Sequence, residues 1–143
     1  MELLIPTDGE VAALDELSTV LPAHGFPGVT RAAQTLGTKI PTQTTKPAEF
    51  GRVMTVGGAG RDLVTDSPLL VLEGYAVKEQ RARDMCALML AAVERAARVG
   101  TLGTAVIYAA RVVGLPANLP HPQVPDRFRF TATVSVDLRR TTA

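Results

Sequence analysis

The feature that most constrains the fold is an alternating segment near the end of the chain, residues 127–139. Apolar side chains occupy every second position, and polar or charged side chains lie between them. This period of two predicts a strand with one buried face and one polar face. A strand of this length is about twice the usual length, so we expect it to project beyond its own sheet. On this interpretation, removing residues 137–143 should weaken assembly with other subunits more than it weakens folding.

Two other segments have helical periodicity. Residues 8–24 carry apolar side chains at three- and four-residue steps, and Thr7 and Glu10 at their start have the spacing of a capping box. Residues 77–99 combine an apolar stripe with oppositely charged pairs at contact spacing on the other side. Each segment is followed by a glycine, which favours the end of a helix. Two helices are therefore expected, each with one face buried against a sheet.

Shorter apolar runs predict three more strands, at 50–57, 68–75 and 104–113. In the run 68–75 Glu73 is the only charged residue, so we expect a central strand that is covered on both faces. Residues 29–48 are rich in threonine but contain two prolines, which favours an edge strand or an extended arm.

Two segments should form loops. Residues 114–126 contain four prolines and are expected to form a constrained, proline-rich loop that leads into the last strand. The glycine-rich segment 57–61 lacks the lysine and hydroxyl of a phosphate-binding loop, so we expect a plain hairpin turn or a mobile loop there.

These elements predict a single α+β domain over residues 1–143. We expect a mixed, mainly antiparallel sheet of about four to five strands, backed by two helices. The expected order along the chain is α-β-β-β-α-β-β, with extended loops or arms. A length of 143 residues fits one domain with a substantial core.

The candidates for chemistry are few. The only cysteine, Cys86, and two histidines cannot supply the ligand spacing of a metal site. His121 lies between two prolines, and the sequence identifies neither a nucleophile nor an acid to accompany it. Asp62 and Asp66 lie beside a turn and are typical turn residues. We therefore expect no catalytic residue, no cofactor and no metal.

Charge and hydropathy restrict the partners. A formal net charge of +1 gives no global attraction to nucleic acid or to an anionic membrane. The arginines of the last strand could form a basic strip, but aromatic residues make up only 4% of the chain, so base-stacking platforms are scarce. Residues 1–5 form an apolar run without a basic leader, so we expect neither a signal peptide nor a membrane anchor. A soluble protein made in the cytoplasm is expected.

The order of elements in the second half of the chain carries a resemblance. Asp66-Ser67-Pro68 is followed by a short apolar strand, the alanine- and arginine-rich helix 77–99 and the strand 104–113. The proline-rich loop, Pro125-Asp126-Arg127-Phe128 and the alternating strand complete the order. Over residues 38–139 this arrangement resembles the tail terminator, or tail completion, proteins of long-tailed bacteriophages, especially those that infect actinobacteria.

The resemblance implies an α+β subunit that forms a six-membered ring on the head-proximal end of the tail tube. Such a ring stops tube polymerisation and provides a docking surface for the head connector. The implied partners are further copies of this chain as a hexamer, the tail tube protein and the head–tail connector protein, with DNA only passing through the ring lumen and no membrane. The implied location is the virion tail, after synthesis in the host cytoplasm.

Two groups of residues are candidates for contacts in such a ring. The polar face of the last strand is expected to meet another subunit or a partner, and comprises Arg127, Arg129, Thr131, Thr133, Ser135 and Arg139. Loop residues are expected to contact the tube or the connector, and these are Gly58, Arg61, Asp62, Asn118 and His121.

Three alternatives stay open at this point. The same composition fits a head–tail connector or another minor tail protein. It also fits a small-molecule-binding α+β regulatory module that uses the glycine turn and the 114–126 loop as a pocket. A small enzyme is the third alternative, and the missing pair of base and nucleophile argues against it.

Overall fold

The computed structural model describes residues 2–43 and 45–143, which form two helices and eight strands. In chain order these are β1 (Leu4–Ile5), α1 (Gly9–Ala23), β2 (Leu36–Gly37), β3 (Glu49–Gly60), β4 (Thr65–Ala76), α2 (Glu79–Val99), β5 (Thr101–Leu102), β6 (Ala105–Asn118), β7 (Phe128–Arg139) and β8 (Thr141–Thr142). Positions 1 and 44, which fall in the apolar N-terminal run and in the expected arm, lie outside the described residues.

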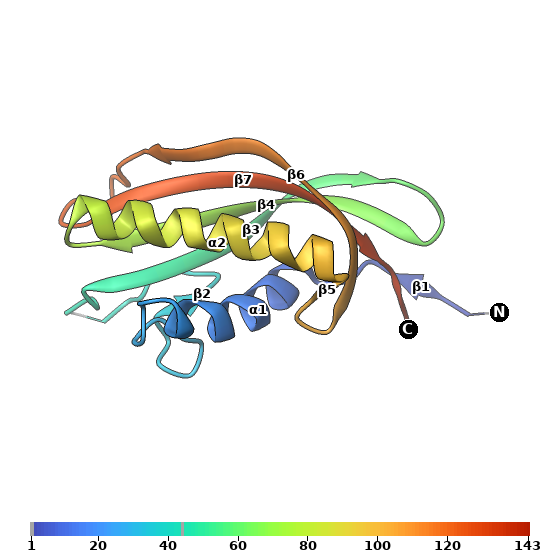
Figure 1. The fold of residues 1–143 in the computed structure, drawn as a ribbon, viewed down its shortest axis with the longest axis horizontal. Coiled ribbons are helices and arrows are strands. Elements are labelled where there is room, and N and C mark those ends of the chain that lie inside the picture. Colours follow the sequence, from blue (N-terminus) through green and yellow to red (C-terminus); the bar gives the residue numbers. More distant parts are fainter. Residues whose placement is uncertain (1, 44) are drawn as a thin grey trace.

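The main sheet has six strands in the order β2-β3-β4-β7-β6-β5, and β1 and β8 form a separate two-stranded sheet (Figure 1). All neighbours in the main sheet are antiparallel except β2 and β3, which are parallel. The expected α+β class with a mainly antiparallel sheet and two helices is confirmed. The strand count and the order differ from the expectation because the two-residue strands β1, β5 and β8 are too short to show a period.

The last long strand, β7, lies in the middle of the sheet. It pairs with β4 from Phe128 to Arg139 and with β6 from Phe130 to Leu138. The strands β3, β4 and β6 contain 12, 12 and 14 residues, so the 12 residues of β7 match their neighbours in length. The prediction that this strand projects beyond its sheet is therefore wrong.

Two expected loops are partly strand. The glycine-rich segment belongs to β3, and the turn follows it, where the amides of Arg61 and Asp62 donate to the carbonyl of Thr65. Strand β6 continues to Asn118, through the first part of the predicted proline-rich loop. Breaks in the register between Val112 and Ala117 accommodate Pro116, which has no amide hydrogen to donate.

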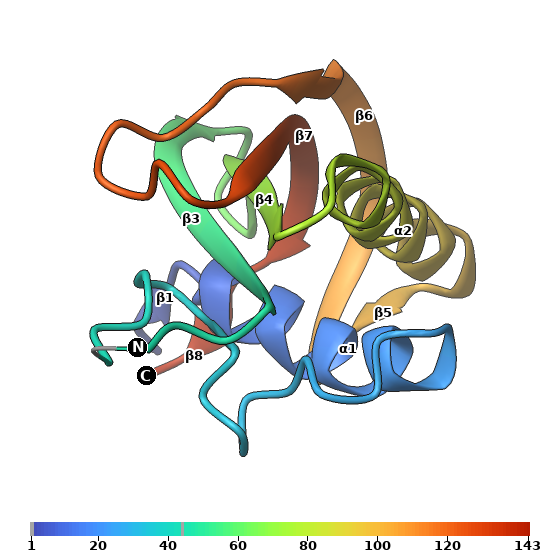
Figure 2. The same ribbon diagram turned by 90° about the vertical axis from the view of Figure 1, so that its left-hand side faces the viewer.

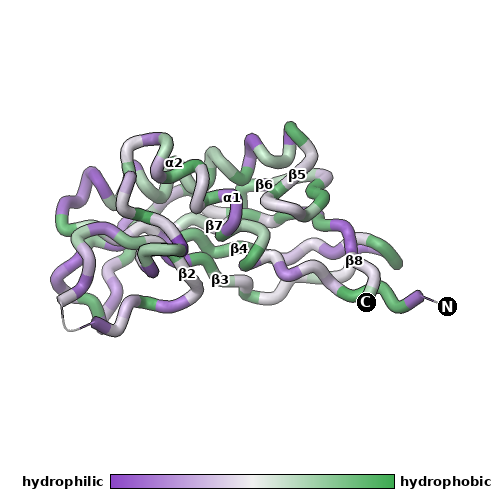
Figure 3. The backbone as a smooth tube through the Cα atoms, turned by 90° about the horizontal axis from the view of Figure 1, so that it is seen from below, coloured by the Kyte–Doolittle hydropathy of each residue, from purple (hydrophilic) through white to green (hydrophobic). Residues whose placement is uncertain are grey.

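Both helices pack on the same face of the curled sheet and touch each other (Figure 2). The apolar positions of β4 and β7, among them Leu72 and Val134, are fully buried there. Gly74 lets α2 approach closely, because a Cβ atom at this position would lie 2.8 Å from the carbonyl oxygen of Ala82. Hydrophilic positions gather in the loops at the end of the molecule away from the termini (Figure 3).

Helix α1 begins where expected, but not through a capping box. Its N-cap is Asp8, whose carboxylate accepts from the amide of Val11 at 3.1 Å. The hydroxyl of Thr7 instead donates to the carbonyl of Arg139 at 2.5 Å. Glu10 reaches the sheet, where its carboxylate accepts from the amide of Thr55 at 3.0 Å. These contacts fasten the first turn of α1 to two strands.

Candidate functional site

The sheet face opposite the helices carries two buried carboxylates, Glu73 in β4 and Asp137 in β7, each only 1% exposed. Both alternate along their strands with core residues, so both point away from the helices. Buried charge is unfavourable unless it is paired and hydrogen-bonded. We define this face, with its two carboxylates and the residues around them, as the open face.

Glu73 is paired with two arginines and a tyrosine. Arg52 Nε donates to Oε1 at 2.5 Å, Arg129 Nη1 donates to Oε2 at 2.8 Å, and the Tyr75 hydroxyl donates to Oε1 at 3.0 Å. Burial, together with the charge of Glu73, raises the pKa of Tyr75 to about 12. Burial alone would lower the pKa of Arg52, but the hydrogen bond and charge of Glu73 raise it overall. Tyr75 and Arg52 therefore keep their protons near neutral pH, so the cluster is suited to holding structure.

A small second core covers this cluster. The rings of Phe50 and Tyr75 stack with centroids 4.6 Å apart, and the buried side chain of Val124 packs on them with Ile40. This contact fixes the loop between β6 and β7 onto the open face. Residues from β3, β4 and two loops therefore meet at this end of the sheet.

His121 is held by the same loop. Its ring lies 6.4 Å from that of Tyr75, and Nδ1 accepts from the amide of Gln123 at 3.1 Å. Burial, and then the charges of Arg129 and Arg52, lower the pKa of His121. The ring is therefore neutral at neutral pH and closes its own turn.

Arg127 and Arg129, two residues of the expected partner surface, are directed at the chain itself. Arg127 donates from Nη2 to the carbonyl of Lys46 at 3.0 Å and from Nε to that of Pro47 at 3.2 Å. Arg129 Nε donates to the carbonyl of Leu119 at 2.5 Å. The two side chains are only 12% and 18% exposed. They fasten the loop before β3 and the loop after β6 to the start of β7.

Asp137 forms the second cluster, at the other end of the open face. Arg111 donates to both of its carboxylate oxygens, at 2.8 and 3.1 Å, and Arg61 donates to Oδ2 at 2.8 Å. The hydroxyl of Ser67 donates to Oδ1 at 2.6 Å. The hydrogen bond from Arg111 is the largest influence that holds the pKa of Asp137 at about 2, against the opposing effect of burial, and Ser67 adds to it. Arg61 comes from the β3–β4 turn, so this carboxylate also anchors that turn.

The remaining polar positions of β7 lie between or beside the two clusters. Thr131, Thr133 and Ser135 are half-buried on the open face, and Arg139 is exposed at the end of the strand. The Oγ1 atom of Thr131 is buried and has no hydrogen-bond partner among the described residues. Arg111 Nη2 approaches the hydroxyl of Ser135 at 3.4 Å.

The candidate loop residues are separated into two groups at opposite ends of the long axis (Figure 1). Gly58, Arg61 and Asp62 belong to the β3–β4 hairpin end, where the carboxylate of Asp62 accepts from the amide of Val64 at 2.9 Å. That hydrogen bond is the main cause that lowers the pKa of Asp62. Asn118, the last residue of β6, and His121, in the β6–β7 loop, lie at the other end. The regulatory-module alternative requires a pocket between the glycine segment and the 114–126 loop. The two segments lie at opposite ends of the molecule and do not share one.

Sequence reasoning missed the residues that hold the open face together, which are Arg52, Ser67, Glu73, Arg111 and Asp137. One signal was present: Glu73 is the only charged residue in an otherwise apolar run. Its two arginine partners come from other strands, and only the strand register brings them together.

The outer edge of β6 is open over most of its length. In the part of the chain that the structure describes, β5 pairs with only Ala105 and Val106, and the last contact on that side is the Ile107 amide with the Gly100 carbonyl. Beyond this point β6 carries large apolar side chains that reach the solvent. These are Tyr108, Val112, Val113 and Leu115, with exposed fractions of 51%, 38%, 62% and 72%.

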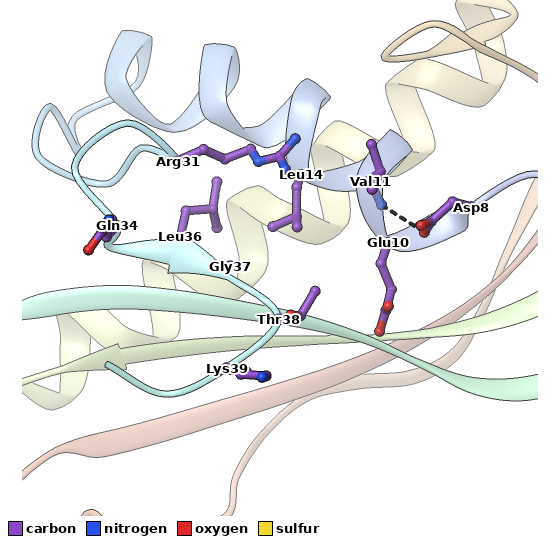
Figure 4. Close-up of a pocket in the computed structure, with 10 residues that line it drawn as sticks. All are labelled: Asp8, Glu10, Val11, Leu14, Arg31, Gln34, Leu36, Gly37, Thr38 and Lys39. Carbon is purple, nitrogen blue, oxygen red and sulfur yellow. Dashed lines mark hydrogen bonds between the residues drawn. The ribbon is translucent and has the colours of Figure 1, made fainter. Parts of the chain in front are cut away.

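The opposite edge of the sheet, along β3, is also partly open. Strand β2 pairs only with Gly51 and Arg52. Further along, the outward amide of Thr55 is satisfied by the carboxylate of Glu10 instead of a strand. A hollow of about 550 Å³ lies beside this edge, between the first turn of α1 and residues 36–39 (Figure 4).

Within residues 2–43 and 45–143, no group of three or more His, Cys, Asp or Glu side chains is arranged to hold a metal ion. None of the described helices is long and apolar enough to cross a membrane. Burial, and then the charge of Glu73, raises the pKa of the Cys86 thiol to about 12.

No protein-family model matches this chain, and no curated protein matches it.

Proposed function

We propose that this chain is a structural subunit of a long-tailed bacteriophage tail, a tail terminator. As a ring on the head-proximal end of the tail tube, it ends tube polymerisation and provides the docking surface for the head connector. DNA passes through the lumen of the ring. The proposal begins from the resemblance in element order and draws its support from the shape of the subunit.

The observation that carries the proposal is the position of the two loop groups. The β3–β4 hairpin and the β6–β7 loop lie at opposite ends of the long axis, and strands join them (Figure 1). A capping ring has to present one surface to the tube and a different one to the connector. A subunit with different loops at the two ends of its strands supplies both surfaces when copies stand side by side.

The open face supports a role that depends on geometry. Its carboxylates are buried beneath arginines, and its tyrosine has a pKa of about 12. The arginines paired with these carboxylates come from other strands and from the β3–β4 turn, so the pairs fix the positions of loops at both ends of the sheet. Stable loop positions are what a docking surface requires.

The test is tube polymerisation with the cognate tail tube protein. We expect tubes assembled with this chain to stop growing, and labelled copies to lie at one tube end in electron micrographs. A paired substitution at the hairpin end, Arg61→Ala with Asp62→Ala, and a separate one at the other end, Asn118→Ala, should affect different partners. The variant at one end should bind the tail tube protein more weakly, and the variant at the other end should bind the head connector more weakly.

Unchanged tube lengths, with no copies at tube ends, would remove the terminator proposal. Binding to the connector without binding to the tube would favour a head–tail connector instead. Both outcomes are measured on the same purified protein.

A further inference from the structure

The directions of the four long strands determine how two copies can share a sheet. In the order β3-β4-β7-β6 each strand is antiparallel to the next. The outer strands β3 and β6 therefore run antiparallel to each other. When a second copy stands beside the first in the same orientation, β6 of one copy meets β3 of the next in antiparallel fashion. The alternation of the sheet continues without inverting either copy.

Both edges lack the charges that usually prevent strand pairing. No residue from Met54 to Gly60 is charged, and Arg111 is the only charged residue of β6. Arg111 is occupied by Asp137 on the open face. Large apolar side chains are exposed on both strands, including Val56 at 54% on β3 and Leu115 at 72% on β6. Among the described residues, no strand pairs with the outer edge of β3 after Arg52 or of β6 after Val106, and apolar side chains lie beside both edges.

The β3 edge directs backbone amides outward, and an added strand would replace Glu10 at one of them. The amide of Gly51 points outward and donates to the carbonyl of Thr35 at 2.8 Å. Because the direction of the amides alternates along a strand, those of Val53 and Thr55 also point outward. The Glu10 carboxylate on Thr55 takes the position that the carbonyl of an added strand would occupy. The hollow beside it leaves room for side chains of that strand.

Local features limit the length of the pairing. Strand β2 covers the beginning of β3, so pairing starts after Arg52. On β6, Pro116 has no amide hydrogen, and pairing ends before it. The segment of β6 between Ile107 and Pro116 remains, and the segment of β3 after Arg52 matches it in length.

We propose that β6 of one copy pairs antiparallel with β3 of the next, so that the sheets of successive copies join into one continuous sheet. The inference rests on the proposed function in taking the partner to be another copy of this chain. Each interface joins two different surfaces, and such heterologous contacts close into a ring when the rotation per copy allows it. The helices then lie together on one side of the joined sheet.

Charge placed on the edge tests the pairing. In Leu115→Lys and Val113→Lys a cation would meet the neighbouring strand, so we expect the oligomer measured by analytical ultracentrifugation to be lost or at least tenfold weaker. The matched control is Leu63→Lys, which changes a side chain that is 88% exposed in the β3–β4 turn, outside both edges. Thermal unfolding of all three variants should stay close to that of the original chain.

Cross-linking tests the register. Val56→Cys and Val113→Cys are combined in a chain in which Cys86→Ala removes the natural thiol. Oxidation should give a ladder of linked copies, whereas neither cysteine alone should link two copies. Dimers from Val113→Cys alone would mean that β6 pairs with β6 about a two-fold axis, and would overturn the proposal.

The outcomes separate this inference from the proposed function. If Leu115→Lys and Val113→Lys form rings that cap tubes as the original chain does, the edge pairing is wrong and the terminator proposal survives. If the edges are needed for assembly but the oligomer does not cap tubes, the pairing stands and the terminator proposal fails. A chain that stays monomeric at every concentration and in the presence of tubes contradicts both.

Discussion

At the scale of single residues, the two carboxylates of the open face are both buried and paired with arginines, but their arginines differ in exposure. Glu73 is enclosed by Arg52 and Arg129, which are themselves mostly buried. Asp137 is equally buried, but its arginines are more than half exposed. Removing a partner from a buried ion pair leaves an uncompensated charge, which costs more than the loss of a surface pair.

We predict that Glu73→Gln lowers the free energy of unfolding by about 3 kcal/mol, because two guanidinium groups lose their shared carboxylate. Urea denaturation measures this change. The control is Asp126→Asn, whose carboxylate is 66% exposed and pairs with Arg127. The control should change stability by less than about 1 kcal/mol. Equal effects of the two substitutions would show that Glu73 is no more than a surface partner.

The free energy of unfolding should depend on pH through the protonation of Asp137. Its pKa is about 2 in the folded chain and 3.8 ordinarily, so the unfolded state takes up this proton first as the pH falls. The resulting stabilisation of about 2 kcal/mol is complete above about pH 4 and is lost as the pH falls through about 2. In Asp137→Asn this part of the acid transition should disappear. Parallel acid-unfolding curves for the two proteins would contradict the assignment.

At the scale of elements, the close contact of α2 with β4 depends on Gly74. A Cβ atom there would lie 2.8 Å from the Ala82 carbonyl oxygen and 3.0 Å from the Cys86 amide nitrogen. We predict that Gly74→Ala costs about 1–3 kcal/mol, because backbone atoms of the helix have to move. The control Gly37→Ala, where a Cβ atom meets no described atom within 4 Å, should cost less than about 0.5 kcal/mol. Thermal and urea unfolding measure both.

Elements with a long, regular period could be predicted from the sequence. The helices and β7 begin within a residue or two of the expected positions, because their patterns persist over many residues. The short strands could not be predicted, since tertiary contacts alone make them. The glycine segment and Pro116 are typical of a turn and a loop, but irregular pairing lets β3 and β6 include them.

In the candidate site too, the sequence predicts the regular pattern but not the contacts between strands. Alternation along β7 correctly separates a core face from a polar face. The partners of that polar face depend on which residues of β3, β4 and β6 stand opposite, and a single sequence does not contain this register. The sequence therefore places Arg127 and Arg129 on a polar surface but does not reveal that they hold loops of their own chain.

At the scale of the whole molecule, the central position of β7 changes the expected effect of truncation. Asp137 and Leu138 are each 1% exposed, so removing residues 137–143 opens the core. We predict that this deletion abolishes cooperative unfolding in circular dichroism, whereas deletion of 141–143 alone, which removes β8, keeps it. A folded protein without residues 137–143 would restore the earlier expectation that this end serves assembly more than folding.

The place of β7 in the sheet also has a consequence for synthesis. Strands β4 and β6 are neighbours only through β7, so the sheet cannot close until residue 139 has left the ribosome. A nascent chain that has emerged only as far as β6 lacks the middle of its core and cannot present two correctly spaced edges. An incomplete translation product would therefore lack the pair of edges through which we propose that copies join.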